Sequence, residues 1–120
     1  MDILFIQYPK CSTCQTAKKW LCDNGISHTE RNIKEENPTF EELCAWYTQS
    51  GIELRKYFNT SGLIYKAQNL KEKLPEMSET EQLSLLASDG MLVKRPIIVS
   101  GGKVLLLGFK EELWAKALIK

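Results

Sequence analysis

Two cysteines stand where the first expected strand passes into the first expected helix. Cys11 and Cys14 lie between the apolar run Ile3–Ile6 and an amphipathic segment that ends at Gly25. A cysteine at a helix start faces backbone N–H groups without helical partners and the positive end of the helix dipole, and both favour the thiolate. Because the thiolate is the reactive form, Cys11 is the expected nucleophile. Cys14 lies one helical turn further on, within reach for closing a disulfide.

The residues around this pair support sulfur chemistry. Lys10 adds a positive charge that also favours the thiolate, and Lys10, Ser12 and Thr13 are candidate substrate-binding residues. A structural zinc site needs four ligands. The remaining candidates show no second paired spacing, so no metal is expected; Cys22 and Cys44 are interpreted as small apolar residues within helices, and His28 as a structural or surface residue.

Length and charge exclude several classes of protein. The chain has 120 residues, a formal net charge of +1 and 43% hydrophobic residues, which suits one globular domain. The near-neutral charge offers no footprint for direct nucleic-acid binding, and no apolar run approaches the roughly 20 residues that cross a bilayer. The N-terminus lacks the pattern of a secretion signal. We therefore expect a cytoplasmic protein, in which cysteines do not form a structural disulfide framework.

The hydrophobic pattern predicts strand, helix, strand, a helical insert, two strands and a helix. Joining the two ends in one mixed sheet gives an α/β fold with a thioredoxin-like core at about 1–36 and 92–120 and a helical lobe at about 37–91. The strands are expected at residues 2–7, 27–33, 97–99 and 104–107, and the helices at 12–24, 39–50, 54–58, 63–74, 78–88 and 111–120.

Several single residues sharpen this prediction. Thr39 and Glu42 have the spacing of a capping box, and Pro75 is expected to end the helix before it. In a fold of this kind Pro96, directly before a strand, is the natural place for a cis-proline facing the thiols, and it is a further candidate substrate-binding residue. The apolar side of the last helix is expected to carry Leu113, Trp114 and Leu118.

Four segments resemble the arsenate reductase (ArsC) family and its Spx-type relatives. They are Tyr-Pro-Lys-Cys-Ser-Thr-Cys at 8–14, Phe-Asn-Thr-Ser-Gly at 58–62, Ala-Ser-Asp-Gly-Met-Leu-Val-Lys-Arg-Pro at 87–96 and Gly-Phe-Lys at 108–110. The resemblance extends over essentially the whole chain and implies the same fold, a thioredoxin-like core interrupted by a helical domain. It also implies that Cys11 is the nucleophile and that Arg95 lies beside its sulfur, where a guanidinium stabilises a thiolate and holds an oxyanion.

The sequence departs from glutathione-dependent arsenate reductases at two positions. Those enzymes have two further active-site arginines, which align near Asn59 and on Gly108 here, and this argues against arsenate turnover. The polar turn that starts at Asn59 is a candidate substrate-binding element in their place. Conversely, those enzymes carry one active-site cysteine and need an external thiol, whereas this chain supplies a second in Cys14.

Two functions of different classes follow. The first is a thiol–disulfide redox enzyme of the arsenate reductase type, acting on a small oxyanion or disulfide. It would bind no cofactor and be regenerated by an external thiol reductant of the glutathione/glutaredoxin or thioredoxin type. The alternative is an Spx-type redox-sensing regulator that binds the C-terminal domain of the RNA polymerase α subunit, without direct nucleic-acid binding. A scaffold that keeps a reactive thiol but has lost arsenate activity is a third reading.

Overall fold

The computed structural model describes residues 2–119 of the chain. It divides into two units. One, here called the sheet unit, comprises residues 1–32 and 95–120, and the other, the helical unit, comprises residues 33–94. The corresponding boundaries expected from the sequence were at 36/37 and 91/92.

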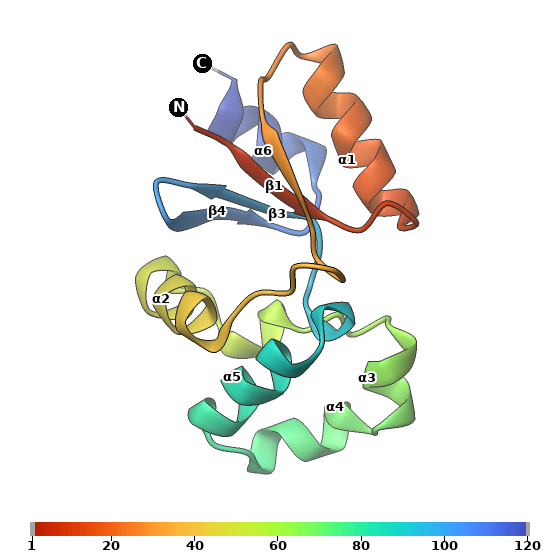
Figure 1. Ribbon diagram of the computed structural model, residues 1–120, viewed down its shortest axis with the longest axis vertical. Helices are drawn as coiled ribbons and strands as arrows, with labels where there is room; N and C mark the ends of the chain where they lie inside the picture. Colours follow the sequence, from red (N-terminus) through yellow and green to blue (C-terminus); the bar gives the residue numbers. More distant parts are fainter. Residues whose placement is uncertain (1, 120) are drawn as a thin grey trace. The chain divides into compact units, whose positions relative to one another are not determined.

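The sheet unit contains a four-stranded mixed sheet in the order β2-β1-β3-β4. β1 pairs with β2 in parallel, and β3 runs antiparallel to both β1 and β4 (Figure 1). The predicted α/β fold with a thioredoxin-like mixed sheet is thereby confirmed. The elements of this unit are β1 (Leu4–Gln7), α1 (Ser12–Asp23), β2 (Thr29–Asn32), β3 (Ile97–Ser100), β4 (Lys103–Leu107) and α6 (Glu111–Leu118).

The core of the sheet unit lies between one face of the sheet and the helices α1 and α6, which lie on the same side of it (Figure 1). Trp114 is 1% exposed at its centre, and its ring meets Phe5 edge to face at 6.2 Å. The indole Nε1–H donates to the Gly108 carbonyl at 2.9 Å, so the buried polar group is satisfied. The buried members of this cluster are Ile3, Phe5, Ala17, Leu21, Ile98, Leu106 and Trp114.

The prediction for the last helix is correct for Trp114 and wrong for Leu113. Leu113 is 53% exposed, whereas Ala117 and Leu118 pack against the core. Residues three and four positions apart share a helix face, so Ala117 and Leu118 follow Trp114 onto the buried side. Leu113 is its immediate neighbour and points about 100° away from it.

The helical unit is built from short helices, and two of them begin with a capping box. Thr39 caps α2 together with Glu42, as predicted, and Ser78 caps α5 together with Glu81. None of the helices within residues 2–119 is long and apolar enough to cross a membrane. The elements are α2 (Phe40–Ser50), α3 (Leu63–Ala67), α4 (Leu70–Lys73) and α5 (Glu79–Ser88), with 3₁₀ turns at Leu54–Tyr57, Leu74–Glu76 and Gly90–Leu92.

The single helix predicted for residues 63–74 is wrong. It is divided into α3 and α4 at Asn69, whose backbone adopts the left-handed conformation with φ 54. Asparagine tolerates this conformation better than other residues with a side chain, which is why the break falls there. The α-helix does end before Pro75, since α4 stops at Lys73, and Pro75 lies near the start of the 3₁₀ turn Leu74–Glu76 that follows.

The two ends of the helical unit are held together at Gly90. A Cβ atom built on Gly90 would lie 1.8 Å from the carbonyl oxygen of Ile33, so only glycine fits this close approach. Nearby, the Asn37 side chain donates to the Ala87 carbonyl at 2.7 Å. The segment that leaves this unit is also fixed, because the backbone N–H of Lys94 donates to the Tyr57 carbonyl at 2.7 Å.

Candidate functional site

The β1–α1 turn and the residues before β3 lie at the same end of the two central strands of the sheet. β1 and β3 are antiparallel neighbours, with Ile6 opposite Ile97. Continuing this register by two residues places Tyr8 opposite Arg95. The Arg95 guanidinium carbon does lie over the Tyr8 ring, 5.3 Å from its centroid. The site therefore joins segments from opposite ends of the chain.

Cys11 stands at the N-cap of α1 and is partly exposed. Its backbone N–H donates to the Tyr8 carbonyl at 3.0 Å, which closes the turn after β1. Its own carbonyl accepts the N–H of Gln15 at 3.0 Å, the first bond of the helix, while the Gln15 side chain reaches back to the Pro9 carbonyl at 2.7 Å. The loop is thus fixed on both sides of the sulfur.

The surroundings of Cys11 favour its thiolate. Partial burial acts to raise the pKa of Cys11, but the backbone N–H and thiol of Cys14 and the hydrogen bond and charge of Arg95 act against it. The balance is a pKa below the ordinary cysteine value. A donor at the helix start was expected from the sequence, the cation is Arg95 as the family resemblance implies, and the Cys14 thiol adds a further donor.

Cys14 has the opposite character. It is 1% exposed, and burial, reinforced by the neighbouring Cys11 sulfur, raises the pKa of Cys14 to about 12. The Tyr8 backbone N–H and the charge of Arg95 lower it only in part. The pair therefore consists of an accessible sulfur that ionises readily and a buried sulfur that keeps its proton and donates it in a hydrogen bond.

Arg95 and Pro96 lie at the entry to β3. The Arg95–Pro96 peptide bond is cis, as predicted for this position. Pro96 is buried, and its carbonyl accepts the backbone N–H of Gly108 at 2.8 Å. Gly108 has φ 81, in the left-handed region that side-chain-bearing residues rarely adopt, so a glycine suits the chain at this point.

Of the other predicted substrate-binding residues, three lie next to Cys11 in the sheet unit and one lies in the helical unit. Lys10, Ser12 and Thr13 are exposed around Cys11, and the Ser12 carbonyl accepts the Thr16 hydroxyl at 3.1 Å. Asn59 belongs to the helical unit, where its backbone N–H donates to the Leu92 carbonyl at 2.7 Å. A role for Asn59 in binding stays a prediction.

Cys22 lies within a helix as expected, but the burial implied by its interpretation as a small apolar residue is wrong. Cys22 is exposed on α1, and Cys44 is partly exposed. The buried side of α1 carries Cys14, Ala17 and Leu21, at helical spacing, and Cys22 follows Leu21 directly onto the outer side. Cys22 is therefore a useful internal reference: an accessible thiol away from a helix start.

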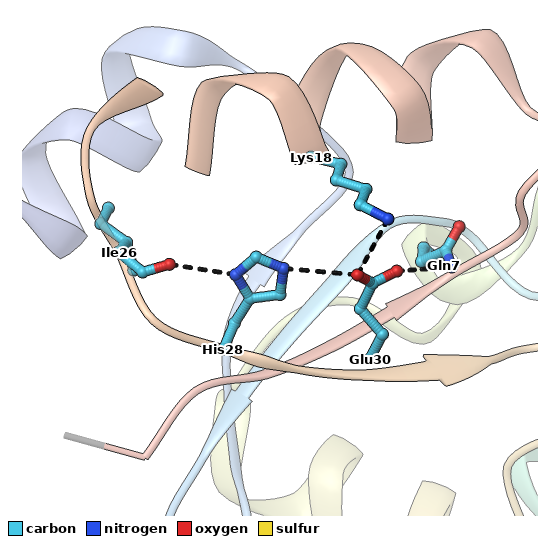
Figure 2. Close-up of polar contacts among 5 residues, drawn as sticks. All are labelled: Gln7, Lys18, Ile26, His28 and Glu30. Atoms are coloured by element: carbon cyan, nitrogen blue, oxygen red, sulfur yellow. Dashed lines mark hydrogen bonds and ion pairs between the residues drawn. The ribbon is translucent and has the colours of Figure 1, made fainter. Parts of the chain in front are cut away.

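His28 is held in a polar network at the edge of the sheet (Figure 2). Its Nδ1 lies 3.0 Å from the Ile26 carbonyl, its Nε2 lies 3.7 Å from Glu30, and its ring meets Phe5 edge to face. Glu30 also pairs with Lys18 of α1 at 3.0 Å and accepts from Gln7 of β1 at 3.2 Å. The network ties α1, β1 and β2 together, in keeping with a structural histidine.

Tyr8 is the residue of this site that the sequence did not single out. It contacts Arg95 through its ring, Cys11 through its carbonyl and the Cys14 sulfur through its backbone N–H. The motif at 8–14 contains it, but only the strand pairing shows that it faces Arg95. Within the described part of the chain, no group of three or more His, Cys, Asp or Glu side chains is arranged to hold a metal ion.

The sequence profile of the ArsC family matches residues 6–117, nearly the whole chain. This chain belongs to the ArsC family. The assignment includes both cysteines and the Arg95–Pro96 pair, and it confirms the resemblance found in the sequence.

One relative of the chain is uncharacterised and another is named a regulator. The chain is 56% identical over 112 residues to YusI of Bacillus subtilis (strain 168), an uncharacterised protein, covering 93% of this chain and 94% of that one. It is 30% identical over 106 residues to the global transcriptional regulator Spx of Staphylococcus aureus (strain Mu50), covering 87% and 77%.

Solved structures share the fold over most of the chain. A protein of Bacteroides fragilis related to the ArsC family is 56% identical, with a TM-score of 0.91 and 98% of both chains covered. A protein of Streptococcus mutans UA159 described as a "possible arsenate reductase" is 45% identical, with a TM-score of 0.85 and 90% and 91% covered.

Proposed function

We propose that this ArsC-family protein is a thiol–disulfide oxidoreductase with Cys11 as its nucleophile and Cys14 as its resolving thiol. The observation that carries the proposal is the contrast between the two sulfurs. Cys11 is accessible and its pKa is lowered by Cys14 and Arg95, whereas Cys14 is buried and its pKa is raised. A two-thiol reduction needs one thiol that attacks first as a thiolate and a second that stays protonated until it resolves the intermediate.

The reaction begins with attack of the Cys11 thiolate on an electrophilic sulfur of a disulfide. A bond forms between Cys11 and that sulfur, the disulfide bond breaks, and the other half leaves as a thiolate. Cys11 is now neutral, so it no longer opposes ionisation of Cys14. Cys14 loses its proton to solvent or to the departing thiolate and attacks the Cys11 sulfur, which releases the second half of the substrate.

The cycle leaves a Cys11–Cys14 disulfide, and the substrate has gained two electrons and two protons. An external thiol reductant of the glutathione/glutaredoxin or thioredoxin type returns the pair to the dithiol and is itself oxidised. A small oxyanion such as arsenate could enter the same cycle with Arg95 as its cationic contact. The Asn59 and Gly108 positions supply no further cation, so a disulfide is the favoured substrate.

The test combines a mass measurement with turnover. Mild oxidation of the reduced protein with peroxide should remove two hydrogens from the wild type and from Cys22→Ser, but not from Cys11→Ser or Cys14→Ser. Purified protein with a thioredoxin system should then reduce a small disulfide repeatedly, and arsenate slowly or not at all. Persistence of the two-hydrogen loss in Cys14→Ser, or an absence of turnover with every reductant, would contradict the enzyme.

A second function is favoured by the likeness to Spx, which is named a global transcriptional regulator. In this alternative the same disulfide changes the affinity of a protein surface for the C-terminal domain of the RNA polymerase α subunit. Capture of the chain on that domain, measured with reduced and with oxidised protein, separates the two proposals. Binding that depends on the Cys11–Cys14 disulfide, without turnover, would identify a regulator.

A further inference from the structure

One residue beside the two cysteines, Tyr8, contacts both of them and Arg95. The Tyr8 carbonyl accepts the Cys11 N–H at 3.0 Å, and its own backbone N–H interacts with the Cys14 sulfur. Its ring lies under the guanidinium of Arg95, with 5.3 Å between the centroid and the guanidinium carbon. A cation within about 6 Å of a ring centroid is attracted by the negative face of the ring.

The backbone fixes both partners of this contact. Tyr8 directly follows β1 and Arg95 is separated from β3 by Pro96 alone, so the register Ile6–Ile97 sets them opposite each other. The turn bond to Cys11 holds the Tyr8 main chain, and the bond between Gly108 and Pro96 holds the chain next to Arg95. The side chain that must be restrained is therefore the long, flexible arginine.

An aromatic ring is well suited to hold an arginine whose charge is needed elsewhere. A carboxylate would fix a guanidinium but would also offer a negative charge in competition with the Cys11 sulfur. A ring attracts the guanidinium through its quadrupole and leaves the in-plane N–H groups available for hydrogen bonds. Arg95 does interact with Cys11 both as a hydrogen-bond donor and as a charge.

We propose that Tyr8 is a positioning residue whose ring holds the Arg95 guanidinium against the Cys11 sulfur and so sets the reactivity of that sulfur. The proposal rests on the assignment of Cys11 as the nucleophile. It gives Tyr8 a part in the reaction without contact to the substrate.

The experiment compares two substitutions at Tyr8 by peptide-resolved alkylation with iodoacetamide across a pH series. Tyr8→Leu removes the ring, and at a pH below the wild-type midpoint Cys11 should react about threefold to tenfold more slowly, the equivalent of one cation–π contact. Tyr8→Phe keeps the ring and should restore the wild-type profile. The exposed Cys22 should react at the same rate in all three proteins.

A double substitution shows whether Tyr8 acts through Arg95. In the Arg95→Ala background, Tyr8→Leu should slow Cys11 no further, because the group that the ring positions is absent. Equal slowing by Tyr8→Leu in both backgrounds would overturn the proposal, as would a wild-type rate in Tyr8→Leu. A failed Tyr8→Phe rescue would also overturn it, since the ring would then not be the part that matters.

A direct readout separates this proposal from the proposed function. In the wild type the Arg95 Nε–H proton should show an upfield ring-current shift in ¹H–¹⁵N NMR spectra, kept in Tyr8→Phe and lost in Tyr8→Leu. If Arg95→Ala leaves Cys11 reactivity unchanged, the proposed activation of Cys11 fails, and so does the effect assigned to Tyr8. If Arg95→Ala slows Cys11 but Tyr8→Leu changes neither the Cys11 alkylation rate nor the Arg95 Nε–H shift, Arg95 still activates Cys11. The positioning role of Tyr8 is then contradicted.

Discussion

The sheet unit joins distant parts of the chain by strand pairing, whereas the helical unit combines helix caps formed within a few residues with contacts between its two ends. In the sheet unit β1 pairs with β3, so residues near the start of the sequence lie beside residues near its end. In the helical unit, α2 and α5 each begin with a capping box formed within four consecutive residues. The candidate site of the sheet unit uses both: Cys11 and Cys14 are local neighbours in α1, whereas Arg95 is brought beside them by strand pairing. Local sequence therefore marks where helices begin, but long-range pairing decides which side chains meet.

The largest effect is expected at the core of the sheet unit. Trp114→Ala should lower the free energy of unfolding by about 3–5 kcal/mol, because it removes a fully buried ring and the partner of the Gly108 carbonyl. Urea unfolding followed by circular dichroism measures it. Leu113→Ala, one residue earlier and exposed, should change it by less than about 0.5 kcal/mol. Similar losses for both would mean that α6 does not pack as described.

A smaller but still substantial effect is expected at Gly90 of the helical unit. Gly90→Ala places a Cβ 1.8 Å from the Ile33 carbonyl oxygen, and since backbone must shift we expect a loss of about 2–3 kcal/mol. Gly51→Ala is the matched control, because it has φ 70 but open space around it, and should cost about 1 kcal/mol. If Gly90→Ala costs no more stability than Gly51→Ala, the close approach of Gly90 to the Ile33 carbonyl is contradicted.

The buried Cys14 thiol should make the free energy of unfolding fall as the pH rises into the alkaline range. The folded pKa of Cys14 is raised to about 12, so the native state keeps a proton that the unfolded chain loses above its own cysteine pKa of about 8.5. The resulting stability is complete below the unfolded pKa and declines as pH rises towards 12. Between pH 8 and about pH 10 the loss should be about 2 kcal/mol in reduced protein.

Cys14→Ala is the control for this pH effect. It removes the titrating sulfur, so its free energy of unfolding should fall less than that of the wild type over the same interval, when both are measured by urea unfolding. Identical pH dependence in the two proteins would show that Cys14 ionises no less readily when folded than when unfolded.

The smallest effect is expected at a helix cap of the helical unit. Thr39→Ala removes the side chain that accepts the Glu42 backbone N–H at 3.1 Å, and should cost about 0.5–1 kcal/mol. Thr48→Ala makes the same chemical change at an exposed position inside α2 and should be neutral or slightly stabilising. Equal effects of the two changes would show that the capping box adds nothing beyond helix propensity.

Most of the fold was predictable because its signals are local. The Thr39 capping box and the strand–turn–helix around Cys11 were read correctly from the sequence. The errors arose where the conformation or direction of one residue differed from what the hydrophobic and helical pattern around it predicts. Asn69 divides a segment that looks uniformly helical, and Leu113 faces outward although its apolar character suggests the core.

The candidate site shows the same division. Cys11 at the start of α1, Cys14 one turn on and cis-Pro96 before a strand were expected, and the structure has each of them there. The exposure of Cys22 was not expected, since a free cysteine is so often buried. Tyr8 was missed because its partner lies near the other end of the chain.

The sequence by itself determined that this chain has a cysteine at a helix start, a second cysteine one turn later and an arginine before a proline. These are properties of short stretches, and short-range sterics and hydrogen bonding settle them. The tertiary structure alone decided that the arginine meets the first sulfur, that the second sulfur is sealed from water and that a tyrosine ring lies under the guanidinium. Ionisation depends on burial and on neighbouring groups; the Cys14 donors to Cys11 are local, but the paired strands bring the Arg95 charge close.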